Sequence, residues 1–187
     1  RSPQYYVFPL WARFGGQMLQ TQSTLNAATQ LSVYGGQVDA NTISLLAINK
    51  TNAAITGTIA INSANGNLNV TGGSVDVMQA ATLNAQAVTF NNVSDPADNL
   101  NNAPALPLGA FGASITYRFA PNSITLLRLQ TGSATEATAT PPATATATAA
   151  PPTIPTVTGT PALPQITMQI DAQPDSIQNF NFTGGLG

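Results

Sequence analysis

Apolar residues recur at every second position along most of the first 130 residues, and this period of two constrains the fold more than any other feature of the sequence. Such alternation is typical of β-strands with one buried and one solvated face. About eight short strands at this spacing predict a mainly β fold, an antiparallel β-sandwich. The alternating runs are 31–33, 43–47, 55–61, 75–77, 87–90, 114–119 and 123–129.

Glycine-containing pairs lie between or beside these runs at Gly35-Gly36, Asn65-Gly66 and Gly72-Gly73. Glycine and asparagine tolerate positive φ, so we expect turns at all three pairs. The stretch 91–112 is longer than an ordinary hairpin loop and is predicted to be an insertion or a contact loop. Asp95 and Asp98 within it are interpreted as turn residues, because a calcium site would need a third carboxylate or a glycine-kinked loop.

The N-terminal segment 5–14 is the one aromatic-rich stretch, and its i, i+3, i+4 spacing predicts a helix that Gly15-Gly16 ends. Pro9 inside it removes a backbone donor, so the helix is expected to be short, kinked or begun late. Such an apolar helix is not stable alone and must pack on another part of the protein. If the ring of Trp11 is buried there, Trp11→Ala should lower the free energy of unfolding by on the order of 3 to 5 kcal/mol. The predicted packing residues, at an interface with another domain, are Tyr5, Tyr6, Phe8, Trp11 and Phe14.

Tyr34 and Tyr117 are more isolated aromatic residues. Tyrosine rings supply flat contact area on which sugar rings can stack. Packing inside the protein is the favoured interpretation for both residues, with sugar stacking kept as the alternative. For Trp11 we favour packing more strongly, because it lies within the aromatic cluster.

Charged residues make up 6% of the chain, against roughly 25% in an average soluble domain. Amides and hydroxyls replace them, as is typical of extracellular bacterial β-proteins, so we expect a bacterial protein that is extracellular or attached to the cell surface. The net charge is −2 without a basic cluster, so nucleic acid is not an expected partner. The sequence contains no apolar run of the length that a membrane-spanning helix needs.

Chemically reactive residues are scarce: the sequence has no histidine, no cysteine and one glutamate, Glu136, within a run of Thr, Ala and Pro. Disulfides, cysteine-based metal sites and thiol chemistry are therefore excluded. Acid–base chemistry would depend on a few scattered aspartates. We expect no catalytic residue, no cofactor and no metal site in this chain.

Residues 131–164 consist largely of Thr, Ala and Pro, which predicts a disordered, extended linker able to separate two modules by up to roughly 100 Å. Beyond it, alternating runs at 166–170 and 178–183 predict two strands, too few to hold a core. Residues 165–187 are therefore interpreted as the start of a second, incomplete β-module. The predicted organisation is a terminal helix of an upstream domain at 1–20, a sandwich at 21–130, the linker at 131–164 and the second module.

Four segments together resemble the C-terminal end of a retaining glycoside hydrolase with a (β/α)₈ barrel. They are Tyr5-Tyr-Val-Phe-Pro-Leu-Trp-Ala-Arg-Phe-Gly15, Leu25-Asn-Ala-Ala-Thr-Gln-Leu-Ser-Val-Tyr34, Ile43-Ser-Leu-Leu-Ala-Ile-Asn-Lys50 and Ala120-Pro-Asn-Ser-Ile-Thr-Leu-Leu-Arg-Leu129. The resemblance is to family 44, with families 51 and 39 as neighbours. It implies that the aromatic helix is the last of the barrel and that a β-sandwich packs on the barrel's side. The 43–50 segment would lie in the middle of the sandwich and the 120–129 segment would be its closing strand.

This resemblance brings no catalytic residue onto the chain. The family uses two glutamates about 5 Å apart, and both are expected upstream of Arg1. A second, shorter segment, 170–184, resembles the start of a prealbumin-like repeat of bacterial surface proteins.

Two functions follow. In the favoured one, the chain is a non-catalytic accessory domain of a secreted modular glycoside hydrolase that acts on plant-type polysaccharide of the β-glucan or xylan class. Its partner is the catalytic barrel in cis. In the alternative, it is a carbohydrate-binding or adhesive cell-surface β-domain without an associated enzyme.

Overall fold

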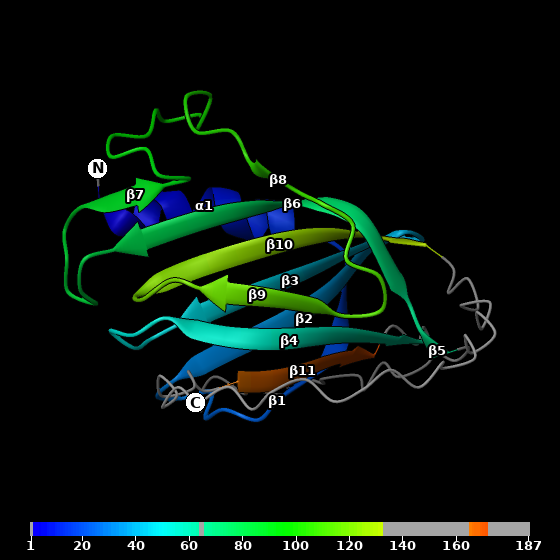
Figure 1. The fold of residues 1–187 in the computed structure, drawn as a ribbon. Helices are drawn as coiled ribbons and strands as arrows, with labels where there is room; N and C mark the ends of the chain where they lie inside the picture. The colour runs from blue at the N-terminus through cyan, green and yellow to red at the C-terminus, as the bar shows by residue number, and fades with distance from the viewer. Residues whose placement is uncertain (1, 64–65, 133–164, 172–187) are drawn as a thin grey trace, which may run out of the picture.

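The computed structural model describes residues 2–63, 66–132 and 165–171, and its fold is the predicted antiparallel β-sandwich preceded by one helix (Figure 1). The helix α1 spans Pro3–Phe14. The strands are β1 (Gln17–Ser23), β2 (Leu31–Asp39), β3 (Thr42–Asn49), β4 (Ile55–Ser63), β5 (Gly66–Asn67), β6 (Asn69–Ala80), β7 (Val88–Phe90), β8 (Leu106–Leu108), β9 (Ile115–Phe119), β10 (Ser123–Gly132) and β11 (Gln165–Asp171).

Two sheets form the sandwich and share the strand β1. Sheet A has the order β1-β2-β3-β10-β6-β7, with β8 also on β6. Sheet B has the order β5-β4-β11-β1, with β9 also on β4. Residues 17–19 of β1 pair with β2, whereas residues 20–23 pair with β11, so β1 passes from one sheet to the other. The sandwich is therefore closed along this side.

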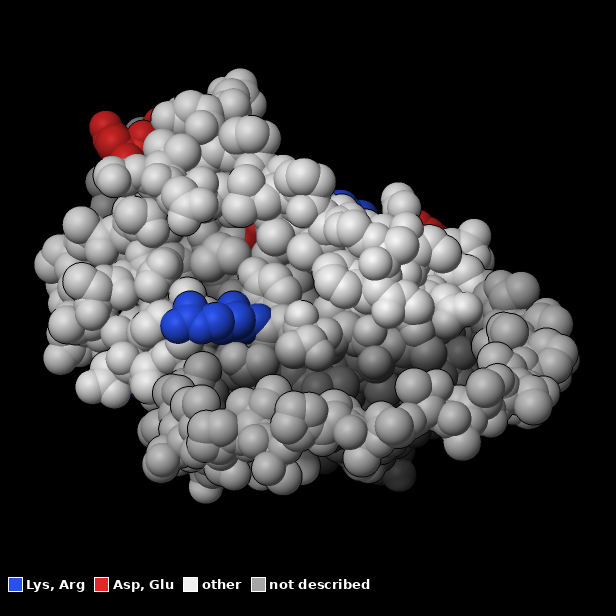
Figure 2. Space-filling model, in the orientation of Figure 1, with Lys and Arg blue, Asp and Glu red and all other residues white. Residues whose placement is uncertain are grey.

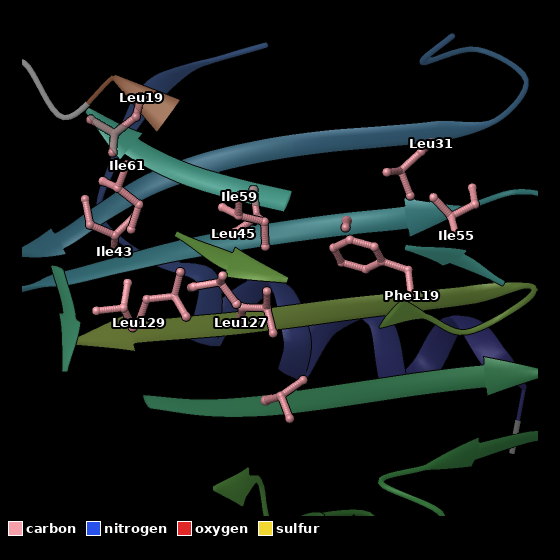
Figure 3. Packing of buried hydrophobic residues seen from close by; sticks show 14 residues of the cluster. Leu19, Leu31, Ile43, Leu45, Ile55, Ile59, Ile61, Phe119, Leu127 and Leu129 are labelled. Atoms are coloured by element: carbon pink, nitrogen blue, oxygen red, sulfur yellow. The ribbon is translucent and has the colours of Figure 1, made fainter. Parts of the chain in front are cut away.

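The inner faces of the two sheets enclose the main hydrophobic core (Figure 3). Leu45 and Leu127 reach it from neighbouring central strands of sheet A, and Ile59 and Phe119 reach it from sheet B. All four side chains are at most 1% exposed. Burial of such side chains is the main favourable term in folding, at about 25 cal/mol per Å² of apolar area.

Two segments of the glycosidase-like pattern, 43–50 and 120–129, lie side by side in sheet A. Strand β10 pairs with β3 from Ser123 opposite Asn49 to Gln130 opposite Thr42. Strand β3 lies in the middle of sheet A, as the resemblance implied. Strand β10 is also central, between β3 and β6, and does not close the sheet at an edge.

Two of the predicted glycine turns are instead parts of strands: Gly35-Gly36 lies inside β2 and Gly72-Gly73 inside β6. The β2–β3 turn occurs at residues 40–41. A Cβ atom on Gly36 would lie 2.9 Å from Cζ of Phe14 and 3.0 Å from the carbonyl oxygen of Gly15. Glycine is therefore needed there for the close approach of the helix end, not for a change of chain direction. Of the third pair, Gly66 opens β5 opposite Ser63, while Asn65 lies outside the described residues.

Two strands cross the domain limits expected from the sequence. Strand β1 runs through the limit at residue 20. Strand β11 pairs with β1 and β4 inside sheet B, where the sequence predicted a second module from residue 165. Without β11, the backbone N–H and C=O groups on the facing sides of β1 and β4 would have no partners. A strand at this position supplies their hydrogen bonds. Residues 133–164 and 172–187, which hold most of the predicted linker and module, lie outside the described residues.

Among the described residues, charged side chains are sparse on the surface, and few of them are visible on the face in Figure 2. Within the described ranges, no helix is long and apolar enough to cross a membrane.

Candidate functional site

Helix α1 lies across the outer face of sheet A and forms a third layer there (Figure 1). Its buried residues Tyr6, Leu10 and Phe14 follow i, i+4 spacing. They pack in a second hydrophobic cluster with residues of the sheet, among them Leu46 and Leu126. The helix runs through Pro9 and ends at Phe14, before Gly15 as predicted. Sheet A is therefore apolar on both faces, one toward the sandwich core and one toward α1.

The 91–112 loop holds the first half of the helix. The Tyr6 hydroxyl donates to the Pro96 carbonyl at 2.9 Å, and the Tyr5 hydroxyl donates to the Asp98 carbonyl at 3.4 Å. Leu100 of the same loop is buried in the second cluster. The long loop is thus a contact loop within this chain, and it covers one end of α1.

A charged contact that the sequence does not indicate holds the second half of the helix. Nη1 of Arg13 lies 2.9 Å from Oδ1 of Asp76, which is 3% exposed. The Asn91 side-chain amide donates to the same carboxylate oxygen at 2.9 Å and to the Pro104 carbonyl at 2.8 Å. Asn91 has φ 49°, a left-handed conformation that asparagine tolerates well. One buried carboxylate therefore connects the helix, β6 and the long loop.

Beside the helix, part of the outer face of sheet A stays uncovered and forms a groove of about 290 Å³. The Trp11 ring lies along it and stacks on Phe14, with centroids 5.3 Å apart and an angle of 14° between the planes. Two lining side chains carry a polar group, the Tyr34 hydroxyl and the Trp11 indole N–H. Helix and sheet both contribute to the groove: the lining residues are Val7, Leu10, Trp11, Tyr34, Leu46, Ile48 and Ile124.

The structure divides the five aromatic residues predicted to pack at a domain interface. Tyr6 and Phe14 are buried against this chain's own sheet, whereas Tyr5, Phe8 and Trp11 are 37%, 74% and 53% exposed. These three residues form the outer aromatic face of α1. Of the five residues, these three have exposed side-chain surface that could contact another domain.

The two candidate sugar-stacking residues lie in different environments. Tyr34 is 37% exposed and lines the groove together with Trp11, so these two candidates from distant parts of the sequence come together. Tyr117 is half-buried, packs against the main core and meets the Phe119 ring edge-on at 5.0 Å. Burial raises the pKa of Tyr117.

Acidic residues of the described ranges are spread over separate places. Asp39 is the last residue of β2, and its carboxylate accepts the backbone N–H of Asn41 in the following turn at 2.8 Å. Asp76 lies beneath the helix, and Asp95 and Asp98 lie in the long loop. These described residues include no group of three that could hold a metal ion. The groove can offer apolar contact, not acid–base chemistry.

No protein-family model matches the chain, and no curated protein matches it by sequence. Among solved structures, it is similar to parts of glycoside hydrolases of families 44, 51 and 30. A family 44 xyloglucanase from Paenibacillus polymyxa, solved with xyloglucan, is 19% identical over 55% of this chain and 17% of its own, with a TM-score of 0.38.

An arabinose-bound α-L-arabinofuranosidase of family 51 is 16% identical over 71% of this chain and 20% of its own, with a TM-score of 0.48. A family 30 endoxylanase from Clostridium papyrosolvens is 20% identical over 68% and 28%, with a TM-score of 0.45. The chain therefore spans less than a third of the length of each of these enzymes, from 17% to 28%.

Proposed function

We propose that this chain is the non-catalytic β-sandwich accessory domain of a secreted, modular glycoside hydrolase. The outer aromatic face of α1 and the adjoining groove are its contact surface for the catalytic barrel in cis. One observation carries this proposal: the outer face of sheet A is apolar, yet α1 covers it only in part and itself presents Phe8 and Trp11 to solvent. Exposed apolar patches of this kind mark contact sites.

The chemistry of the lining favours a protein partner over a sugar. Sites that recognise sugars surround the ligand with placed hydrogen-bond donors and acceptors, because buried sugar hydroxyls otherwise lose their partners. Among its side chains, this groove offers two such groups, the Tyr34 hydroxyl and the Trp11 indole N–H, while the other five lining side chains are aliphatic. An apolar ridge on another domain would lose no hydrogen bonds on entering the groove.

The place of the surface in the chain supports a partner in cis. Helix α1 begins at Pro3, so any domain encoded before it joins the chain directly at this helix. Contacts between domains of one chain bury about 600–1,500 Å². A groove lined by two exposed aromatic residues, Trp11 and Tyr34, is suited to the centre of such a contact.

The chemistry expected of a glycosidase must then come from outside this chain. Retaining and inverting enzymes both need a pair of carboxyl groups that flank the bond to be cleaved. The sequence holds a single glutamate, and Asp76, the buried carboxylate, is engaged by Arg13 and Asn91. We assign plant-type polysaccharide of the β-glucan or xylan class to the whole enzyme. The accessory domain supports its barrel and is tethered to further modules.

The test compares one substitution in two contexts. Phe8→Ala is made in the 1–187 chain and in the polypeptide extended by its encoded N-terminal sequence. In the chain alone we expect a change in the free energy of unfolding within about 0.5 kcal/mol, because the ring is exposed. In the extended protein we expect a loss of about 2 kcal/mol or more, as for a buried contact. Leu83→Ala, at an equally exposed residue away from the groove, should have the same small effect in both. Equal effects of Phe8→Ala in both contexts would refute the proposal.

The carbohydrate-binding alternative has its own readout, because Trp11 is the single tryptophan of the chain. Titration of the 1–187 chain with xyloglucan or xylan should leave the Trp11 emission spectrum and its quenching by acrylamide unchanged. A saturable blue shift, lost in Tyr34→Ala, would favour the alternative function.

A further inference from the structure

The inference concerns the position of β11 inside sheet B. Residues 165–171 pair in parallel with residues 56–62 of β4, and residues 168–171 pair in antiparallel fashion with residues 20–23 of β1. The strand is therefore bonded on both sides. Among the described strands, its pairing with β4 is the one parallel pairing.

Strand β4 is held in place without β11, because it is paired on its other side with β9 along residues 55–59 and with β5 at residues 62–63. Residues 20–23 of β1, which face β11 on the other side, continue from residues 17–19, which are paired with β2 in sheet A. Taking β11 away would leave the anchored edge of β4 and the edge of β1 residues 20–23 about 10 Å apart, the width that one inserted strand fills. Their free N–H and C=O groups would form a template for an extended peptide.

The register indicates which peptide this position accepts. Met168 stands opposite Ile59, and Ile170 stands opposite Ile61, and both wall residues are at most 1% exposed. Ile166 stands opposite the buried Gly57. The intervening Gln165, Thr167 and Gln169 stand opposite Thr56, Thr58 and Ala60, which are partly exposed. A ligand therefore needs apolar residues at every second position and neutral polar residues between them.

We propose that the position between β1 and β4 is a binding slot for one extended peptide strand of this pattern. Residues 165–171 fill it as a tethered ligand that can be exchanged for the same strand of another copy or a free peptide. Because residues 133–164 connect β11 covalently to β10, the strand is present at the slot at a high effective concentration, on the order of millimolar for tethered ligands. Strand exchange through such connections is a known low-cost route to association between copies.

The test uses the full chain with a recognition sequence for a site-specific protease in place of residues 145–150. After cleavage, the C-terminal fragment should co-elute with the rest of the chain in size-exclusion chromatography. A fluorescein-labelled peptide of residues 165–171 at about 100 µM should then displace it. The uncut chain should resist the same peptide at least tenfold better, because its own strand competes at the higher effective concentration. Binding is measured by fluorescence anisotropy and displacement by the elution of the released fragment.

Matched peptides test the register. Met168→Asp in the peptide should abolish binding, because that residue stands opposite buried Ile59, whereas Gln169→Asp should weaken it less than threefold. Met168→Pro should also abolish binding, since proline donates no N–H to either wall. The slot is refuted if the fragment leaves on cleavage and the labelled peptide fails to bind a chain whose circular dichroism is native. Unfolding on cleavage would equally refute exchange, because β11 would then be an integral strand. Neither outcome depends on the role proposed for the groove.

Discussion

The two faces of helix α1 are built from the same kinds of residue, yet the structure treats them differently. Tyr6 and Phe14 are at most 4% exposed, while Phe8 is 74% exposed on the same twelve-residue helix. The buried face holds the helix on sheet A, and the outer face contributes little to that packing. Aromatic content alone therefore does not distinguish the residues that stabilise this domain from the residues that are available to a partner.

The largest effect expected from this contrast is at Phe14. Phe14→Ala should lower the free energy of unfolding by about 3–5 kcal/mol, because it empties a buried site under the helix end and removes the ring on which Trp11 stacks. Chemical denaturation followed by circular dichroism measures it. A loss no larger than that of Phe8→Ala would show that the helix is not packed on the sheet.

The next effect is at the carboxylate beneath the helix. Asp76→Ala should cost about 2–4 kcal/mol, because it leaves the buried Asn91 amide and the half-buried Arg13 without their shared partner. Asp76→Asn keeps one acceptor oxygen and should cost less. Asp95→Ala, at an exposed aspartate of the long loop, should stay within about 0.5 kcal/mol in the same denaturation experiment. If Asp76→Ala and Asp95→Ala lowered the free energy of unfolding by similar amounts, Asp76 would not be the group that connects the helix, β6 and the long loop.

Trp11 belongs to the outer face but also stacks on Phe14 of the buried face. The sequence-based expectation of 3 to 5 kcal/mol for Trp11→Ala required a buried ring, but the residue is 53% exposed. Its contact with Phe14 and the groove wall leads us to expect about 1 kcal/mol in the 1–187 chain. A cost as large as that of Phe14→Ala would mean that the groove is closed in solution.

The outer face should show its accessibility directly through an apolar fluorescent dye. Phe8→Ala and Trp11→Ala together should lower the binding of anilinonaphthalene sulfonate to the folded chain severalfold. The exposed pair Leu83→Ala and Phe111→Ala serves as the matched control. Equal dye binding by both double variants would indicate that the groove does not attract apolar ligands.

The smallest effect extends the contrast between buried and exposed groups to a surface carboxylate. Hydrogen bonds from Asn41 and Thr42 lower the pKa of Asp39 below its usual 3.8. A lowered folded-state pKa stabilises the protein above the unfolded-state value, and this contribution is lost as the pH falls through the folded-state value. Asp39→Asn should therefore slightly reduce the loss of stability below about pH 4. Identical pH profiles of thermal unfolding for the two proteins would contradict this.

The class of the fold could be predicted from the residue pattern alone. The period-two runs at 31–33, 43–47 and 123–129 became central strands of sheet A, because alternation places one set of side chains on one face whatever the neighbour is. The helix end at Gly15 was also readable locally. The near absence of histidine, cysteine and glutamate already excluded most catalytic chemistry.

Which face of each helix or strand is covered by other parts of the chain depends on the tertiary structure. The pair Gly35-Gly36 is typical of a turn. Gly36 nevertheless lies in a strand, where Phe14, distant in sequence, packs directly over it and leaves no room for a side chain. Arg13, Asp76 and Asn91 meet only because the helix crosses β6 beside the long loop. Likewise, residues 165–171 join sheet B since β1 and β4 leave room for a strand between them. These contacts depend on long-range packing, which a local pattern of residues does not encode.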